Sequence, residues 1–98
     1  MREATLVVTG VPNPADMESM QAYLQGVMPL LQGAGGKLVK RLKVGETLNG
    51  AKTGMVLVMD FDSAKAVSEL FASDDYQALL PARDKGFKEM NIHITQAM

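Results

Sequence analysis

The side chains best suited to chemistry in this chain are Arg41, Tyr76, Arg83 and His93. Tyr76 and Arg83 stand seven residues apart, so on a helix they would lie on one face and could line the same groove. A guanidinium group can hold a carboxylate through two parallel hydrogen bonds. We therefore predict that these four residues bind a small anionic ligand.

Arg41 lies in a segment that mixes strand-forming residues with cations. Because side chains alternate along a strand, Arg41 is expected to share one face with Lys37, Val39 and Lys43. In one interpretation the segment is a solvated strand whose lysines protect its edge. In the other, Arg41 alone points into the protein interior and anchors an anion.

The other candidates also have alternative interpretations. Arg83 either faces a groove or forms a local ion pair with Asp75 or Asp84. His93 is the single histidine, and it either acts as a general acid–base or belongs only to the polar side of its strand. Tyr23 is expected at the edge of an apolar helical stripe, with its hydroxyl group reaching water.

Composition argues against several classes of function. The chain has no cysteine and one histidine, so we expect no metal, haem, flavin or other cofactor. The net charge of -1 gives no general attraction to nucleic acid or to anionic membranes. Residues 1–5 lack a signal-peptide pattern, and no apolar run approaches the roughly 18 residues of a membrane span. We therefore expect a cytoplasmic protein.

Hydropathy patterns predict alternating strands and helices. Asn13, Pro14 and Asp16 favour a first helix that starts with Asn13 as its cap, and Ser63 and Ser73 are expected to cap two later helices. The last helix is expected to run to Gly86, with Pro81 as an irregularity. The strands are predicted at residues 4–9, 37–44, 54–59 and 90–95, and the first and third are apolar on both faces.

This order predicts one domain, residues 1–98, with an α+β ferredoxin-like βαββαβ fold. A four-stranded antiparallel sheet would carry its helices on one face. Because two strands are apolar on both sides, the second face would expose an unusually large apolar patch. We expect a homodimer that covers this sheet face. Which strand parity faces the partner is left open.

A set of residues between Asn13 and His93 matches a known family pattern. The set comprises Pro29, Gly35, Gly36, Arg41, the segments 48–50 and 60–63, and above all Ser73, Tyr76, Gln77 and Arg83. On these residues the chain resembles the bacterial family of domains of unknown function numbered 1330. The departures are Leu42 and Lys43 where relatives often have glycines, Asp62 in place of a proline, and the absence of tryptophan. The resemblance implies a dimeric α/β barrel with a small cavity in each half, and no established reaction.

Two hypotheses about function follow. The first is a small-molecule-binding dimer that takes a small anionic or aromatic metabolite, with or without cofactor-independent catalysis on a small organic acid or aromatic compound. The second is a non-enzymatic regulatory or assembly module that works through its dimer surface. RNA binding is not expected, because residues 53–59 lack the aromatic side chains on which bases stack. A pocket that contains Arg41, Arg83 or His93 would favour the first hypothesis.

Overall fold

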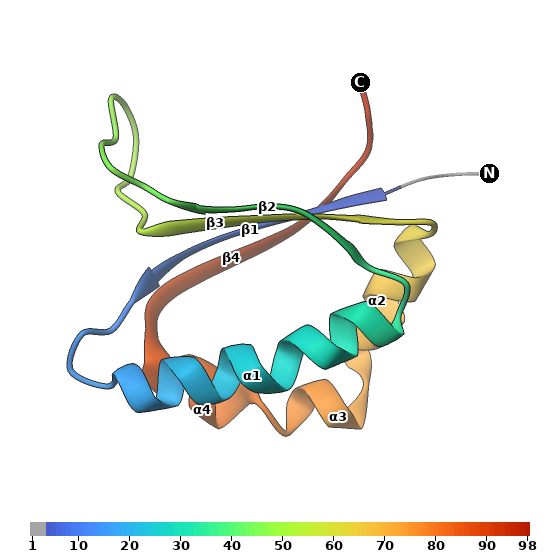
Figure 1. The fold of residues 1–98 in the computed structure, drawn as a ribbon, viewed down its shortest axis with the longest axis horizontal. Coiled ribbons are helices and arrows are strands. Elements are labelled where there is room, and N and C mark those ends of the chain that lie inside the picture. Colours follow the sequence, from blue (N-terminus) through green and yellow to red (C-terminus); the bar gives the residue numbers. More distant parts are fainter. Residues whose placement is uncertain (1–3) are drawn as a thin grey trace.

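The computed structural model describes residues 4–98 as a sheet with a layer of helices on one side (Figure 1). Residues 1–3, part of the segment that lacks a signal pattern, lie outside the described residues. The elements in chain order are β1 (Ala4–Pro12), α1 (Met17–Gly33), β2 (Lys37–Lys43), β3 (Met55–Phe61), α2 (Ala64–Ala72), α3 (Asp74–Gln77), α4 (Leu80–Gly86) and β4 (Phe87–Thr95).

The four strands form one antiparallel sheet in the order β2-β3-β1-β4. The two central strands are therefore the first and third along the chain, and β2 and β4 lie at opposite edges. This arrangement confirms the predicted α+β ferredoxin-like fold. The sheet of one chain is not closed into a barrel, and one of its faces carries no helix (Figure 1).

The core lies between the helices and one face of the sheet. Along β1, Ala4, Leu6 and Val8 are buried, while the residues between them are half-buried. In a single chain only one face of the first and third strands is fully covered, and apolar side chains on the other face, such as Val7 and Val58, are half-buried. The buried side chains are Leu6, Val8, Tyr23, Val27, Leu31, Leu57, Met59, Phe61, Val67, Tyr76 and Phe87.

The first helix begins later than predicted. Asp16 is the N-cap, and its carboxylate accepts hydrogen bonds from the backbone N–H of Ser19 (3.0 Å) and from the Ser19 hydroxyl (2.8 Å). Asn13 instead joins this turn to the end of α4, because its N–H donates to Gly86 O (2.9 Å) and its side chain to Lys85 O (3.0 Å). The side-chain oxygen of Asn13, the group that would cap a helix, accepts instead from Ala15 N–H (3.1 Å) in a turn that precedes the helix.

The third predicted helix is divided into two short helices, α3 and α4. Ser73 caps α3 as predicted, and Gly86 ends α4 as predicted. Ala78 and Leu79 keep right-handed helical backbone angles, but the α-helical hydrogen-bond pattern is interrupted there, and Leu79 N–H donates to Tyr76 O (2.8 Å) three residues back. Pro81 follows at once, and its ring cannot supply the N–H that a continuous helix requires. Tyr76 and Arg83 therefore stand on different helices.

A β-bulge changes the side-chain parity of β2. Leu38 pairs with Met59 and Lys40 with Val58, so Val39 is the extra residue. Arg41, opposite Leu57, consequently lies on the helix side of the sheet with Lys43, whereas Lys37, opposite Asp60, lies on the other side. The expectation that Lys37 and Arg41 share a face is therefore wrong.

Close packing of α4 on α1 makes Gly86 a sensitive position. A Cβ atom there would meet the backbone of Met20 and would lie 2.8 Å from the Ser19 carbonyl carbon. Since backbone cannot move aside as a side chain can, we expect Gly86→Ala to lower the free energy of unfolding by about 1–3 kcal/mol in urea titrations.

Gly33→Ala is the matched control, because a Cβ at Gly33 has no atom within 4 Å. This substitution should leave stability unchanged or raise it by up to about 1 kcal/mol through helix propensity. Equal effects of the two substitutions would contradict the proposed contact.

Candidate functional site

An open groove lies between the short helices and the outer strand β4. Its volume, about 590 Å³, is within the range of small-molecule sites, roughly 300–1,000 Å³. Its walls are mostly apolar, and its polar groups come from the three helices that follow β3. The lining residues are Ser68, Phe71, Ala72, Tyr76, Gln77, Leu80, Arg83, Ile92 and Ile94.

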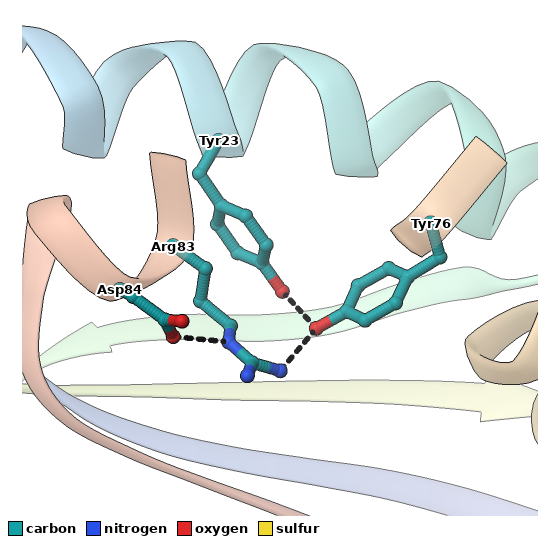
Figure 2. Close-up of polar contacts among 4 residues, drawn as sticks. All are labelled: Tyr23, Tyr76, Arg83 and Asp84. Carbon is teal, nitrogen blue, oxygen red and sulfur yellow. Dashed lines mark hydrogen bonds and ion pairs between the residues drawn. The ribbon is translucent and has the colours of Figure 1, made fainter. Parts of the chain in front are cut away.

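Tyr76 and Arg83 meet at this groove, together with Tyr23 from α1 (Figure 2). The hydroxyl oxygens of Tyr23 and Tyr76 are 2.9 Å apart, and Arg83 Nη1 donates to Tyr76 Oη at 3.1 Å. Arg83 Nε also donates to Asp84 Oδ1 at 3.3 Å. The groove contact and the local ion pair, two alternatives for Arg83, therefore occur together.

The end of α2 and the start of α3 hold Tyr76 in place. The Ser73 hydroxyl donates to Leu70 O (2.6 Å) and accepts from the backbone N–H of Tyr76 (3.3 Å). The Tyr76 ring then packs edge-on against Phe71 (4.6 Å between centroids) and Tyr23 (6.2 Å). With 2% of its surface exposed, Tyr76 is a fixed part of the groove floor.

The hydroxyl pair leaves one proton without an acceptor among the described residues. Two hydroxyl groups carry two protons, and their mutual contact uses one of them. If Tyr76 were the donor, the unused proton would be that of Tyr23, which is 4% exposed and does not line the groove. Burying it unpaired is unfavourable, so the geometry favours Tyr23 as donor and leaves the Tyr76 proton to a group in the groove.

The environment also shifts the ionisation of two of these groups. Burial raises the pKa of Tyr23 above its ordinary value of 10.0, and the hydrogen bond with Tyr76 raises it further. Burial lowers the pKa of Arg83, but its hydrogen bonds with Tyr76 and Asp84 outweigh burial, so the net shift is upward. The site therefore presents a neutral Tyr23 and a cationic Arg83 at neutral pH.

Arg83 retains hydrogen-bonding capacity for a ligand. Its side chain is 29% exposed, so the guanidinium is partly removed from water without being sealed in. Within the described part of the chain, two of its five N–H donors are engaged, by Tyr76 and Asp84. The others are available to an anion that enters the groove.

The other two predicted site residues lie elsewhere in the chain. Arg41 is exposed on β2, at the opposite edge of the sheet from the groove. His93 is exposed on β4 and pairs with Val7, on the sheet face without helices, whereas Ile92 and Ile94 line the groove on the other face. The chain thus brings Tyr76 and Arg83 together but not Arg41 and His93.

Sequence reasoning missed the part played by Tyr23. Its hydroxyl was expected to reach water, but Tyr23 is buried and its oxygen contacts Tyr76, so that expectation is wrong. One feature of the sequence could have indicated this contact: Tyr23 lies within the apolar stripe of α1, and a tyrosine hydroxyl that is buried needs a hydrogen-bond partner. The periodicity of α1 could not reveal which residue that partner is.

Among residues 4–98, no group of three His, Asp or Glu side chains is placed to hold a metal ion. In the same residues, no helix is long and apolar enough to cross a membrane.

The fold and groove define an α+β ferredoxin-like protein with a ligand-sized hollow between helices and sheet. The chain belongs to the family described as Domain of unknown function (DUF1330), whose model matches residues 5–98. This membership confirms the resemblance found in the sequence. A comparison with curated proteins gave no match.

Several solved structures share the fold. A protein of unknown function from Rhodopseudomonas palustris has a TM-score of 0.80 and 16% identity, with 99% of this chain and 83% of that chain covered. A "Putative antibiotic biosynthesis monooxygenase" from Bordetella bronchiseptica has a TM-score of 0.71 and 19% identity, covering 100% and 99%. A dimeric protein of unknown function and ferredoxin-like fold from Bacteroides fragilis has a TM-score of 0.63 and 10% identity, covering 97% and 96%.

The hydroxyl pair predicts unequal effects of removing each oxygen. Tyr76→Phe leaves the buried Tyr23 hydroxyl without its partner and should lower the free energy of unfolding by about 1–3 kcal/mol. Tyr23→Phe leaves Tyr76 bonded to Arg83 and should lower it by only about 0.5–1.5 kcal/mol. Urea unfolding of both variants and of the double variant measures the difference. A larger effect at Tyr23 would contradict this arrangement.

The raised pKa of Tyr23 predicts a loss of stability at alkaline pH. Above pH 10.0 the unfolded chain loses the Tyr23 proton while the folded chain keeps it, so the stability present below that pH falls as pH rises. This one group can contribute a slope of up to about 1.4 kcal/mol per pH unit. Unfolding free energies measured from pH 8 to pH 11 should fall less steeply for Tyr23→Phe than for the wild type. Equal slopes would contradict the prediction.

Proposed function

We propose that the protein binds a small organic anion with an apolar or aromatic body in the groove, with Arg83 and Tyr76 holding the anionic group. The observation that carries this proposal is a partly buried guanidinium with free donors at the polar end of an apolar groove. A carboxylate matches both the Arg83 donors and the unmatched Tyr76 proton. A pocket that contains Arg83 also favours ligand binding over the assembly-module hypothesis.

The walls of the groove suit the body of such a ligand. Phe71, Leu80, Ile92 and Ile94 offer aromatic and aliphatic surface, which stabilises a bound apolar group by removing it from water. Any catalysis here would be cofactor-independent proton transfer with Tyr76, since His93 faces the other side of the sheet. The likeness to a "Putative antibiotic biosynthesis monooxygenase" supports an enzymatic use of this fold.

We also propose that two chains pack through the sheet face without helices. The chain exposes 6480 Å², whereas a compact monomer of 10.6 kDa exposes about 5500 Å². Half-buried Val7, Val56 and Val58 lie at the centre of this face, between Lys40 at one edge and His93 at the other. A second copy would cover this apolar centre, and the dimeric relative from Bacteroides fragilis supports such an assembly.

Ligand binding can be tested with benzoate as the probe and benzamide as its neutral analogue. We expect benzoate to shift the NMR amide signals of α3, α4 and β4, and benzamide to bind more weakly. Arg83→Ala should weaken benzoate binding by about 10-fold or more, because charge-assisted hydrogen bonds contribute about 1.5–3 kcal/mol.

Arg41→Ala is the matched control, since it removes the same charge from the far edge of the sheet. It should leave the benzoate dissociation constant unchanged. If Arg41→Ala and Arg83→Ala weaken binding equally, or if benzamide binds as tightly as benzoate, the groove is not an anion site.

The dimer can be tested with two single variants of β3, each of which places one aspartate on a different face of the sheet. Val58→Asp adds a charge to the face without helices and should give a folded monomer in sedimentation experiments. Leu57→Asp adds it to the core and should unfold the protein, because an unpaired buried charge is not tolerated. A wild-type monomer at micromolar concentration would refute the dimer.

A further inference from the structure

The connection between β2 and β3 forms a projecting arm, residues 45–53. Its base is fixed to the central strand β1: Gly54 N–H donates to Gly10 O (2.8 Å), and the Thr53 hydroxyl donates to the same oxygen (3.1 Å). Val44 N–H closes the base by donating to Gly54 O (2.9 Å). The direction in which the arm leaves the sheet is therefore set by hydrogen bonds to the sheet itself.

Packing and turn geometry add to this constraint. A Cβ atom at Gly54 would lie 2.8 Å from Pro12 Cδ, so the base of the arm lies directly against the end of β1. Gly50 lies in the bend of residues 48–51 and adopts a φ of +96°, a conformation that favours glycine. Leu48 lies in the same bend with 89% of its surface exposed.

The arm rises on the side of the sheet opposite the helices. In Figure 1 the helices lie below the sheet, and the green arm extends above it at one end. The chain after β4 also rises above the sheet, at the other end. A body that rests on the face without helices therefore lies alongside the arm.

We propose that the arm clasps the second copy of this chain and that Leu48 is its apolar contact. This inference rests on the proposed dimer, because the arm overhangs the face through which the two copies pack. A leucine left so fully in water is unfavourable, and burial against the partner removes that exposure. The arm also carries one acidic and one basic side chain, Glu46 and Lys52. Because the two charges have opposite signs, the arm presents no net like charge to the arm of the second copy.

The test uses sedimentation equilibrium to measure the monomer–dimer dissociation constant of Leu48→Ser. Because Leu48 contacts little of its own chain, the variant should fold normally, which circular dichroism checks. Its dimer dissociation constant should rise by about 10-fold or more. An unchanged dissociation constant would overturn the clasp.

Leu38→Ser is the matched control, since Leu38 is 50% exposed but lies opposite Met59, on the helix side of the sheet. Leu38→Ser should leave the dimer dissociation constant unchanged. A rise equal to that of Leu48→Ser would overturn the assignment of Leu48 as the contact. A wild-type protein that stays monomeric would instead refute the proposed dimer, and the clasp with it.

A second measurement exploits the absence of cysteine from the natural chain. In Leu48→Cys, the rate at which a maleimide reagent modifies the thiol reports the exposure of the arm tip. We expect the rate to fall at least several-fold between protein concentrations below and above the dimer dissociation constant. Equal rates in monomer and dimer would show that the arm tip stays in water and would overturn the proposal.

Discussion

Burial of one face of the sheet under the helix layer is the interaction on which the rest of the structure depends. Leu6 and Met59 on the central strands and Leu31 on α1 are almost fully removed from water, and burying each such side chain contributes about 1.5–3 kcal/mol. Once this layer is formed, each strand has one face toward the helices and one face that no helix covers. The groove, the outward-facing sheet surface and the direction of the arm are all defined relative to it.

The tyrosine pair joins this core to the groove. Tyr23 contacts Phe87 of β4 through its ring (5.7 Å between centroids) and Tyr76 of α3 through both ring and hydroxyl, so one side chain ties three elements together. The Arg83 guanidinium in turn donates a hydrogen bond to the Tyr76 oxygen, which holds it in position. The groove's charged group is thereby held by the same contacts that stabilise the fold, and this fixed position would lower the entropic cost of the proposed anion binding.

The two faces of the sheet carry different sets of side chains. The helix side carries the groove, with Ile92 and Ile94 of β4 as part of its wall. The other side carries Val7, Val58 and His93, which pair across the strands. The period of two along a strand separates these sets, so one strand can contribute to a ligand site and to a protein interface without conflict.

Sequence alone was sufficient to predict the order of strands and helices, the ferredoxin-like class, the family and the caps at Ser63 and Ser73. It also selected Tyr76 and Arg83 as neighbours, but on one helix, whereas they stand on α3 and α4. These predictions depend on local periodicity and capping chemistry, which adjacent residues encode. Packing in three dimensions sets the face of Arg41, through a bulge at Val39, and the partner of the Tyr23 hydroxyl. Such features depend on which elements meet in space: a one-residue shift in pairing reverses side-chain direction, and the contact between Tyr23 and Tyr76 spans 53 residues of sequence.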